Sequence, residues 1–233
     1  MPAKPVLAVV IPVYNEAQRL RDLLADWQPV FRATGVPYRL IFIDDGSKDA
    51  SLAMLRDLAT NDDTLDVHTQ PNAGHGPAIL KGYALASEAE WIFQIDSDHQ
   101  LGTAAFKELW ARRAGYDLLM GQRRGPNASA GRQWVTAVSR TVIRTLYGKG
   151  VSDVNVPYRL MRTEVLRPAL TRIPANSFAP NVLLTSWFIR QKRRILLVPV
   201  EQRPAGARKS RLNAYFLKGA VRSFIQTILF RWR

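Results

Sequence analysis

The sequence predicts an α/β fold with a mostly parallel sheet flanked by helices. Short apolar runs alternate with segments of helical period over the first half of the 233-residue chain, a pattern typical of strands alternating with helices. Each apolar run ends in polar residues, and the carboxyl ends of parallel strands share one edge of a sheet, where ligands bind. With 47% hydrophobic residues, the chain can also bury a sizeable core.

The elements can be assigned in order along the chain. Strands are expected at 6–14, 38–47, 65–70, 90–98 and 116–123, alternating with helices at 16–31, 49–59, 76–87 and 103–113. The first helix has the clearest pattern, because Leu20, Leu23 and Trp27 fall on one face. Beyond residue 124 we expect a loop, helices at 132–147, 163–170 and 180–191, an irregular crossing over 148–162, and a strand at 194–203.

The charge balance narrows the range of partners. Lys and Arg number 33 against 19 Asp and Glu, which gives a net charge of +14. Such an excess favours nucleic acid, anionic lipid or phosphorylated substrates. Most acidic residues lie in the first hundred positions, whereas basic residues dominate from Arg112 onward. The absence of cysteine excludes disulfides and thiolate metal sites and fits a reducing cytosol.

The two ends of the chain bear on membrane contact. The N-terminal apolar run is short and typical of a strand, so no signal peptide is expected. No stretch of 18 predominantly apolar residues occurs, so we expect no membrane span. Residues 212–233 instead predict a basic amphipathic helix that includes Lys218 and Arg222. Such a helix lies in the interface of an anionic membrane, or packs on its own domain or on a second subunit.

Two carboxylates directly follow the fourth apolar run. Asp96 and Asp98 form a D-x-D pattern at the expected end of a buried strand. Like charges crowded at the mouth of a sheet do not stabilise it, so a cation is expected between them. Carboxylates two residues apart suit Mg²⁺ or Mn²⁺, and Gln100 can add an amide oxygen. His99 is expected to be a bystander, because imidazole matches Mg²⁺ poorly.

Two further strand ends carry polar residues. Asp44 and Asp45 precede Gly46, which is consistent with a local turn or with carboxylates that accept hydrogen bonds from a base or ribose. Asn72 opens a glycine-containing loop before a helix, where the backbone can approach an anionic ligand closely. The loop has neither the Walker A spacing nor the G-x-G-x-x-G dinucleotide pattern.

Taken together, these segments resemble a known family. The strings VVIPVYNE, FIDDGSKD, NAGHGPAI, QIDSDHQ and GQRR, in this order and spacing, resemble glycosyltransferase family 2. Within it, they are most similar to polyprenyl-phosphate glycosyltransferases of the dolichyl-phosphate mannose synthase type, over about residues 6–212. The resemblance implies a GT-A nucleotide-sugar transferase fold, a divalent metal, and inverting transfer of one sugar.

The resemblance also implies roles for individual residues. Pro12, Tyr14 and Glu16 would contact the nucleotide, and Asp45 or Asp44 would read the base. Asp96 and Asp98, with Gln100, would hold Mg²⁺ or Mn²⁺ on the diphosphate. The other implied residues lie near the reacting groups or bind substrate, with Asp98, Arg123 and Asp153 assigned to catalysis: Asn72, Arg123, Ser139, Asp153, Arg159, Arg208, Lys209 and Arg211. One departure is Val135, which stands where relatives often carry Arg, four residues before Ser139.

The expected reaction moves a sugar from a nucleotide-sugar donor to a polyprenyl (dolichyl or undecaprenyl) phosphate. A phosphate acceptor is already anionic and needs no general base, so Asp153 is expected to orient groups. The alternative is a hydroxyl acceptor of a glycan or glycolipid, with Asp153 as general base. A processive polysaccharide synthase would carry Q-x-x-R-W, which QTILFRW does not match, and no nucleic-acid-binding motif occurs.

The expected organisation follows from these assignments. Residues 1–211 would form the catalytic domain, with a nucleotide-sugar and metal half at 1–124 and an acceptor half at 125–211. Residues 212–233 would form the membrane-proximal helix. The protein would then act in the cytoplasm, peripherally on the inner face of the cell membrane. The sequence does not predict the sugar, the base or the oligomeric state.

Overall fold

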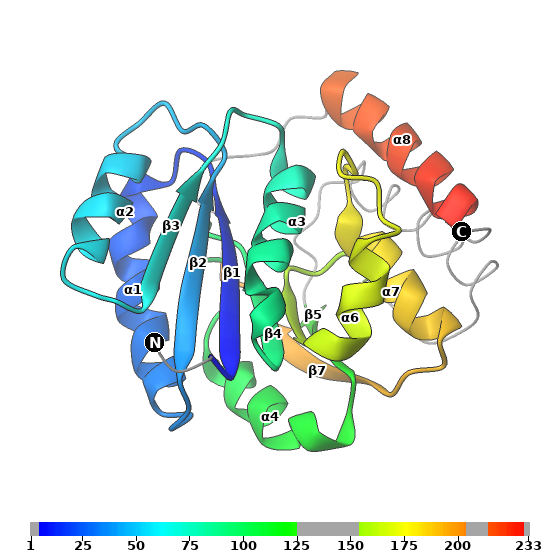
Figure 1. Cartoon of the computed structure of the whole chain (residues 1–233), viewed down its shortest axis with the longest axis horizontal. Coiled ribbons are helices and arrows are strands. Elements are labelled where there is room, and N and C mark those ends of the chain that lie inside the picture. The colour runs from blue at the N-terminus through cyan, green and yellow to red at the C-terminus, as the bar shows by residue number, and fades with distance from the viewer. Residues whose placement is uncertain (1–4, 125–153, 204–213, 231–233) are drawn as a thin grey trace.

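The computed structural model describes residues 5–124, 154–203 and 214–230. A seven-stranded sheet in the order β3-β2-β1-β4-β6-β5-β7 runs through the molecule, with helices on both faces (Figure 1). The strands are β1 (Leu7–Val13), β2 (Tyr38–Asp44), β3 (Leu65–Thr69), β4 (Trp91–Ile95), β5 (Leu118–Arg124), β6 (Tyr158–Arg162) and β7 (Ile195–Glu201). The helices are α1 (Ala17–Arg32), α2 (Ser51–Ala59), α3 (His75–Leu85), α4 (Ala104–Arg112), α6 (Thr163–Leu170), α7 (Pro180–Arg190) and α8 (Ala214–Phe230), with 3-10 turns η1 (Ala86–Glu88) and η2 (Arg113–Gly115).

The sheet is mostly parallel, as the sequence predicts. β1 pairs in parallel with β2 and β4, β2 with β3, and β5 with β7. β6 is the exception, because it lies antiparallel between β4 and β5. Since β4 and β5 both oppose β6, they share one direction. The carboxyl ends of the five strands predicted in the first half therefore meet at one edge, which confirms the expectation on which the site depends.

The main error in the predicted elements is β6. Residues 148–162 were expected to form an irregular crossing, whereas Tyr158–Arg162 form a central strand. A strand with Arg159 fully buried at its centre lacks the apolar pattern of its neighbours. The other described elements match their predicted ranges to within a few residues, because their apolar runs are continuous. The helix expected at 132–147 lies outside the described residues.

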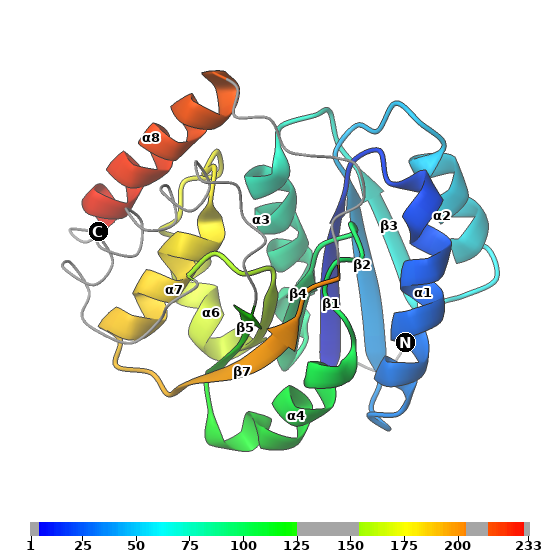
Figure 2. The same ribbon diagram turned by 180° about the vertical axis from the view of Figure 1, so that it is seen from behind.

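An aromatic cluster fixes α1 and α4 to one face of the sheet. Phe106 of α4 lies 4.7 Å from Phe93 of β4 and 5.2 Å from Phe31 of α1, measured between ring centroids. Trp27 stacks on Phe31 at 5.2 Å. Figure 2 shows α1 on the face turned toward the viewer, and Figure 1 shows α3, α6 and α7 on the opposite one.

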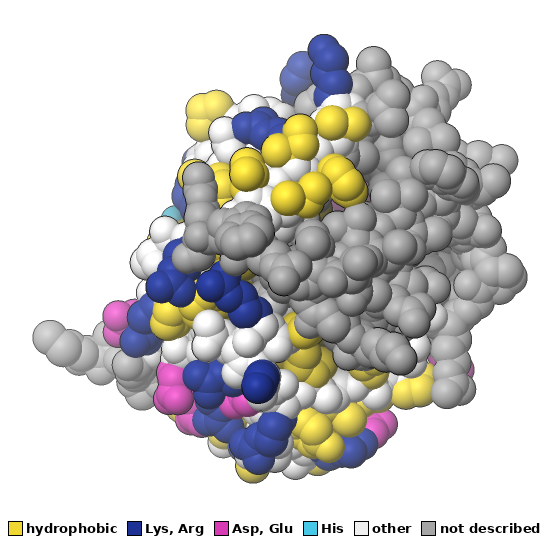
Figure 3. Space-filling model, turned by 90° about the vertical axis from the view of Figure 1, so that its right-hand side faces the viewer, with side chains coloured by type: hydrophobic (Ala, Val, Ile, Leu, Met, Phe, Trp, Pro, Cys, Tyr) yellow, Lys and Arg dark blue, Asp and Glu magenta, His cyan; other side chains and the backbone are white. Residues whose placement is uncertain are grey.

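Helix α8 packs against α7 at the upper right of Figure 1. The ring of Phe230 lies 6.5 Å from that of Trp187, and Arg190 Nη1 donates to the Phe230 carbonyl at 3.4 Å. Its outward face exposes large apolar side chains, and Figure 3 shows hydrophobic groups beside Lys and Arg at the height of α8. Within the described ranges, no helix combines the length and apolarity needed to cross a bilayer.

We expect Phe106→Ala to lower the free energy of unfolding by about 3–5 kcal/mol, since it opens a cavity in the aromatic cluster. Urea unfolding followed by circular dichroism measures this loss. Phe224→Ala is the matched control, because Phe224 is 41% exposed and its loss should change stability by less than about 1 kcal/mol. Equal losses in the two variants would contradict the assignment of Phe106 to the core.

Candidate functional site

A cavity of about 740 Å³ lies at the carboxyl edge of the sheet. Four of the residues predicted to bind the nucleotide or its sugar line it: Pro12, Tyr14, Asp45 and Asn72. The start of α3, the segment before β6 and the loop before α7 form the opposite wall, which includes His75, Asn155, Asn176, Ser177 and Phe178. Lys218, Gly219 and Arg222 of α8 complete the lining. The sequence predicts the first wall but not the contribution of α8.

Asp45 organises the glycine-containing loop. Its carboxylate is 4% exposed and accepts hydrogen bonds from the backbone N–H groups of Ala73 at 2.9 Å and Gly74 at 2.8 Å. Gln70 Nε2 donates to the same group at 2.8 Å. Gly76 then lets the start of α3 approach the facing loop, because a Cβ there would lie 1.9 Å from the Ser177 carbonyl oxygen. Asp45 thus shapes the cavity through the backbone it holds.

Asp44 has a different position from Asp45. It is 1% exposed, and its carboxylate accepts from Ser47 N–H at 3.2 Å and from the Thr69 hydroxyl at 2.9 Å. It therefore ties the end of β2 to β3 and to its own turn. Only Asp45 of the two belongs to the described cavity lining, so Asp45 is the better candidate for a nucleotide contact. Base recognition by either residue stays a prediction.

The turn after β1 is held by hydroxyl groups of the second βα connection. Asn15 has φ 55°, and its N–H donates to Ser47 Oγ at 3.0 Å. The N–H of Glu16 donates to Ser51 Oγ at 2.9 Å. Glu16 forms an ion pair with Arg19 of α1. Tyr14 remains 39% exposed in the cavity wall, where its ring is available to a ligand.

Asp96 and Asp98 lie at the end of β4, as predicted. Burial raises the pKa of Asp96 to about 6, and His75, whose Nε2 lies 3.5 Å from Asp96 Oδ1, opposes this rise. The neighbouring charge of Asp98 raises the pKa further, while the positive charges of Arg123 and Arg159 lower it. Arg123 itself lies near the end of β5 and is exposed. Asp96 and Asp98 thus form a partly buried carboxylate pair, and the positive charges of Arg123 and Arg159 act on Asp96.

A buried hydrogen-bond network holds Asp96 from the interior of the protein. Gln94 of β4 donates from Nε2 to Asp96 Oδ1 at 3.1 Å. Asn181 of α7 donates from Nδ2 to Gln94 Oε1 at 2.8 Å and accepts from the Tyr83 hydroxyl at 2.9 Å. Burial raises the pKa of Tyr83, which keeps its hydroxyl a neutral donor. Sequence reasoning missed this network, although a glutamine inside an apolar strand was a signal for it.

Arg159 lies in the same buried layer, with no exposed surface. Its guanidinium donates to the carbonyls of Val154 and Val156 at 3.1 Å each, and to that of Asn181 at 3.1 Å. These bonds fix the segment that directly follows residue 153. In this structure Arg159 therefore binds backbone next to the site, and its charge acts on Asp96. Direct contact of Arg159 with substrate stays a prediction.

The segment after the D-x-D pair is bound to the end of β7. Arg203 N–H donates to the Gln100 carbonyl at 2.8 Å, and Gln202 Nε2 donates to Gln100 Oε1 at 2.9 Å. His99 Nε2 lies 2.9 Å from Asp26 Oδ2 and 2.7 Å from Arg203 Nη1. His99 is thus engaged with α1 and with the segment that follows β7, and its role as a bystander to the metal stays a prediction. The amide oxygen of Gln100, predicted as a metal ligand, is directed toward Gln202.

The donor set fits a hard divalent cation whose shell substrate completes. Among residues 5–124, 154–203 and 214–230, no three acidic or histidine side chains gather as a full protein metal site. Mg²⁺ and Mn²⁺ are commonly held by one or two carboxylates together with waters and substrate phosphates. Asp96 and Asp98 provide those two carboxylates. When bound there, such a cation would neutralise the charge that develops on a departing diphosphate.

Five predicted site residues lie outside the described residues: Ser139, Asp153, Arg208, Lys209 and Arg211. Their roles stay predictions. The described neighbours of two of these segments are nonetheless informative. Arg159 fixes the residues that follow Asp153, and Arg203, which precedes the basic loop, is bound to the segment after the D-x-D pair. These contacts place Val154 beside the buried Arg159 and Arg203 beside Gln100.

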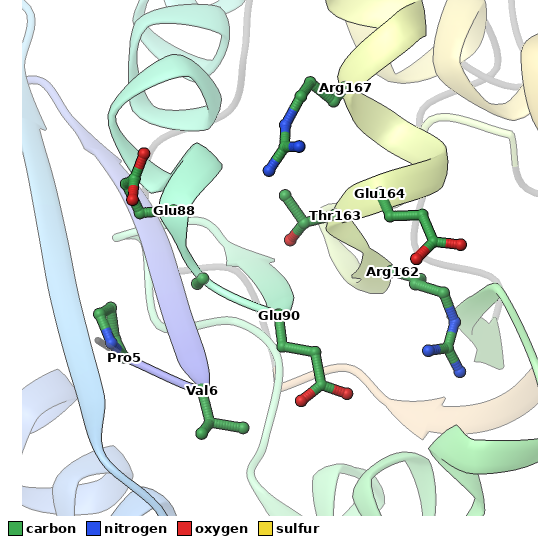
Figure 4. A pocket seen from close by; sticks show the side chains of 9 residues that line it. Pro5, Val6, Glu88, Glu90, Arg162, Thr163, Glu164 and Arg167 are labelled. Carbon is green, nitrogen blue, oxygen red and sulfur yellow. The ribbon is translucent and has the colours of Figure 1, made fainter. Parts of the chain in front are cut away.

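A second cavity, of about 330 Å³, lies near the starts of β1 and β4, away from the polar strand ends (Figure 4). Its two arginines already have partners. Arg162 lies 3.7 Å from Asp117 and stacks on Trp91, and Arg167 donates to the Ser87 carbonyl. Figure 4 shows the carboxylates of Glu88, Glu90 and Glu164 pointing in different directions. The charged side chains of this cavity therefore do not point toward a common ligand, and we do not regard it as a candidate site.

Comparison with known families identifies the chain. The profile of glycosyl transferase family 2 matches residues 8–169. This range contains the carboxyl ends of β1 to β5, the D-x-D pair and, from the buried network, Tyr83, Gln94 and Arg159. The chain belongs to glycosyl transferase family 2. The family resemblance inferred from the sequence is therefore confirmed.

Curated relatives of this family 2 chain include undecaprenyl-phosphate 4-deoxy-4-formamido-L-arabinose transferases. The one from Pseudomonas paraeruginosa is 28% identical over 200 residues, which cover 84% of this chain and 58% of the relative. The one from Klebsiella pneumoniae is 28% identical over 204 residues, which cover 86% and 61%. The chain thus spans about three-fifths of the length of these relatives.

Solved structures with the same fold include glucosyl-3-phosphoglycerate synthase from Mycobacterium tuberculosis. Its complex with Mn²⁺, uridine diphosphate and phosphoglyceric acid matches with a TM-score of 0.71 and 21% identity, covering 98% of this chain and 79% of that one. Its complex with Mn²⁺, UDP-glucose and phosphoglyceric acid matches with a TM-score of 0.70 and 19% identity, covering 99% and 81%. This likeness confirms the expected GT-A type of fold.

We expect Asp96→Asn to stabilise the metal-free protein in a pH-dependent way. The folded-state pKa of about 6 lies above the ordinary value of 3.8, so ionisation of Asp96 favours the unfolded state. This cost is absent below about pH 4 and complete above about pH 6 to 7. Since the side chain is 25% exposed, we expect about 1–3 kcal/mol at pH 7.

Urea unfolding with chelator, of wild type and Asp96→Asn between pH 4 and pH 7.5, measures this effect. The difference in unfolding free energy should grow as the pH rises through 4 to 6. A difference that stays constant over this range would refute the raised pKa.

We expect Asn181→Leu to lower the free energy of unfolding by about 2–4 kcal/mol, since it leaves the buried Tyr83 hydroxyl and Gln94 amide without their best partners. Thermal and urea unfolding measure the loss. Exposed Asn61→Leu is the matched control and should change stability by less than about 0.5 kcal/mol. If Asn181→Leu were as mild as its control, the network would not be a stabilising element.

Proposed function

We propose that this protein transfers one sugar from a nucleotide-sugar donor to a polyprenyl phosphate, with inversion at the anomeric carbon. The observation that carries the proposal is the cavity at the carboxyl edge, which places the Asp45 loop, Tyr14 and the basic residues of α8 around one space. His75 also lines this cavity, and its Nε2 lies 3.5 Å from Asp96 Oδ1 of the D-x-D pair. The undecaprenyl-phosphate transferases that resemble this chain support the choice of acceptor class.

The donor would lie across the ends of β1, β2 and β4. Tyr14 and Asp45 would face the nucleoside, and Asn72 would lie where the glycine-containing loop meets the ligand. Asp96 and Asp98 would hold Mg²⁺ or Mn²⁺ against the diphosphate, with Mn²⁺ supported by the metal content of the glucosyl-3-phosphoglycerate synthase complexes. Gln100 is the weaker ligand of the proposed set, because Gln202 already donates to its oxygen.

The acceptor would attack without a general base. A phosphate ester carries negative charge near neutral pH, so its oxygen is already a nucleophile. Its obstacle is repulsion from the donor diphosphate, which positively charged side chains offset while they hold the two groups in line. Arg123, with Arg208, Lys209 and Arg211 of the basic loop, would have this role. Asp153 would then orient groups, since no proton needs to be removed.

The bilayer surface would be approached through α8. Its outward face combines exposed Val221, Phe224, Ile225 and Leu229 with Lys218 and Arg222, a composition that suits the interface of an anionic membrane. Peripheral attachment to the inner face of the cell membrane follows from the cytosolic supply of nucleotide sugars. In this scheme residues 1–211 form the catalytic unit and 212–233 its membrane-proximal helix.

The test is release of nucleoside diphosphate from a panel of sugar nucleotides with Mg²⁺ or Mn²⁺, with and without a polyprenyl phosphate. The panel includes GDP-mannose, UDP-glucose, UDP-N-acetylglucosamine and UDP-4-deoxy-4-formamido-L-arabinose. We expect turnover that requires one donor, the metal and the lipid phosphate. Asp98→Ala should reduce it at least about 100-fold, which corresponds to roughly 3 kcal/mol of transition-state stabilisation.

Asp22→Ala is the matched control, because Asp22 is exposed on α1 away from the cavity, and it should keep wild-type turnover. Donor-dependent turnover with a hydroxyl acceptor instead of the lipid phosphate would replace the proposed acceptor and make Asp153 a general base. No metal-dependent turnover with any donor would refute the proposal as a whole.

A further inference from the structure

We propose that Lys218 and Arg222 of α8 form the binding site for the phosphate of the acceptor, with the prenyl chain leaving along the apolar face of the same helix. This inference rests on the proposed function and deepens it by naming the acceptor site. Its starting point is the cavity of about 740 Å³, where these two residues lie in the same lining as Tyr14 and Asp45.

The two cations have defined positions, because α8 is held at Gly219, which lies between them, and at its C-terminal end. Gly219 packs so closely on Phe178 that a Cβ at that position would lie 2.3–2.6 Å from carbons of the ring. At the other end of the helix, Phe230 lies beside Trp187 and accepts a hydrogen bond from Arg190. Phe178 also lines the cavity, so the contact that seats the helix is part of the site.

The charges around this part of the cavity favour an anion. Lys218 and Arg222 are one helical turn apart on the same face, where their side chains can reach one ligand. Among the described residues, no carboxylate forms an ion pair with either. Asp45 is the single carboxylate in the described lining, and three donors already bind it. A phosphate monoester suits a Lys and Arg pair, through a point charge and a fork of donors.

The same two residues also line a second hollow. It has a volume of about 460 Å³, and its described lining comprises Lys218, Val221, Arg222, Ile225 and Gln226. The two cations therefore stand between the donor cavity and a largely apolar surface. Val221, Ile225 and Leu229 continue this surface along the helix and are 54%, 50% and 54% exposed. A charged head between two cations, followed by an apolar surface, matches a phosphate ester of a long prenyl chain.

The test is steady-state kinetics with farnesyl phosphate, a short acceptor used below its aggregation concentration and without vesicles. Lys218→Gln/Arg222→Gln should raise the KM for farnesyl phosphate at least about tenfold, since each lost charged contact contributes about a factor of ten. The KM for the sugar nucleotide should change less than about twofold. Lys107→Gln/Arg193→Gln removes the same charge from exposed positions elsewhere and should leave both KM values unchanged.

Two further experiments distinguish a prenyl phosphate from two other phosphate ligands, the headgroups of a bilayer and free inorganic phosphate. Sedimentation with phosphatidylglycerol vesicles compares membrane binding of the same variants. If the double α8 variant lost vesicle binding while its KM for farnesyl phosphate stayed normal, the pair would bind bilayer headgroups and the inference would be wrong. Inorganic phosphate should inhibit the wild type much more weakly than farnesyl phosphate binds, and equal potency would refute the contribution of the apolar surface.

The inference and the proposed function fail in different ways. If the wild type does not turn over with any prenyl phosphate, the proposed function fails and the inference falls with it. If the wild type turns over and the double variant keeps its KM for farnesyl phosphate, only the inference is wrong. Arg222→Lys with Lys218 intact should restore most of the affinity, which separates loss of charge from a change of helix packing.

Discussion

Repulsion between two carboxylates at the end of one buried strand is the constraint on which the rest of this structure depends. Asp96 and Asp98 follow β4 directly, and burial of Asp96 makes its ionised form costly. The surrounding groups offset this cost in part: Gln94 donates to Asp96, His75 lowers the pKa of Asp96, and Arg123 and Arg159 act on it with positive charge. The remaining cost is the property that makes the site receptive to a divalent cation. A neutral side chain in place of one of these carboxylates would remove this cost and make the metal-free protein more stable.

The antiparallel strand β6 makes this arrangement possible. It inserts Arg159 opposite Gln94 in the sheet register and so brings a buried cation beneath the D-x-D pair. The same guanidinium holds the carbonyls that follow residue 153. Asn181 links this layer to α7 and α3 through Gln94 and Tyr83. The position of Asp96 is thus coupled, through Gln94 and Asn181, to helix α7.

The regular half of the fold was predictable, because continuous apolar runs such as 7–13 and 91–95 specify buried parallel strands whatever surrounds them. The convergence of polar strand ends followed from that topology. The sequence did not predict β6, because a buried arginine is stable in a strand only when distant carbonyls accept its hydrogen bonds. It also left Asp44 and Asp45 equivalent, and only their tertiary partners distinguish them. The presence of α8 in the cavity depends on the contact between Gly219 and Phe178, which are 41 residues apart in numbering and give no periodic signal.

The most direct test of the central claim is anomalous diffraction from crystals soaked with Mn²⁺ and a nucleoside diphosphate. We expect a manganese peak at bonding distance from the carboxylates of Asp96 and Asp98, with the diphosphate on its other side and the nucleoside against Tyr14 and Asp45. Crystals of Asp98→Ala prepared in the same way should show no such peak. A peak elsewhere in the molecule, or a diphosphate bound at this edge without metal contact to either carboxylate, would show that Asp96 and Asp98 are not the metal ligands.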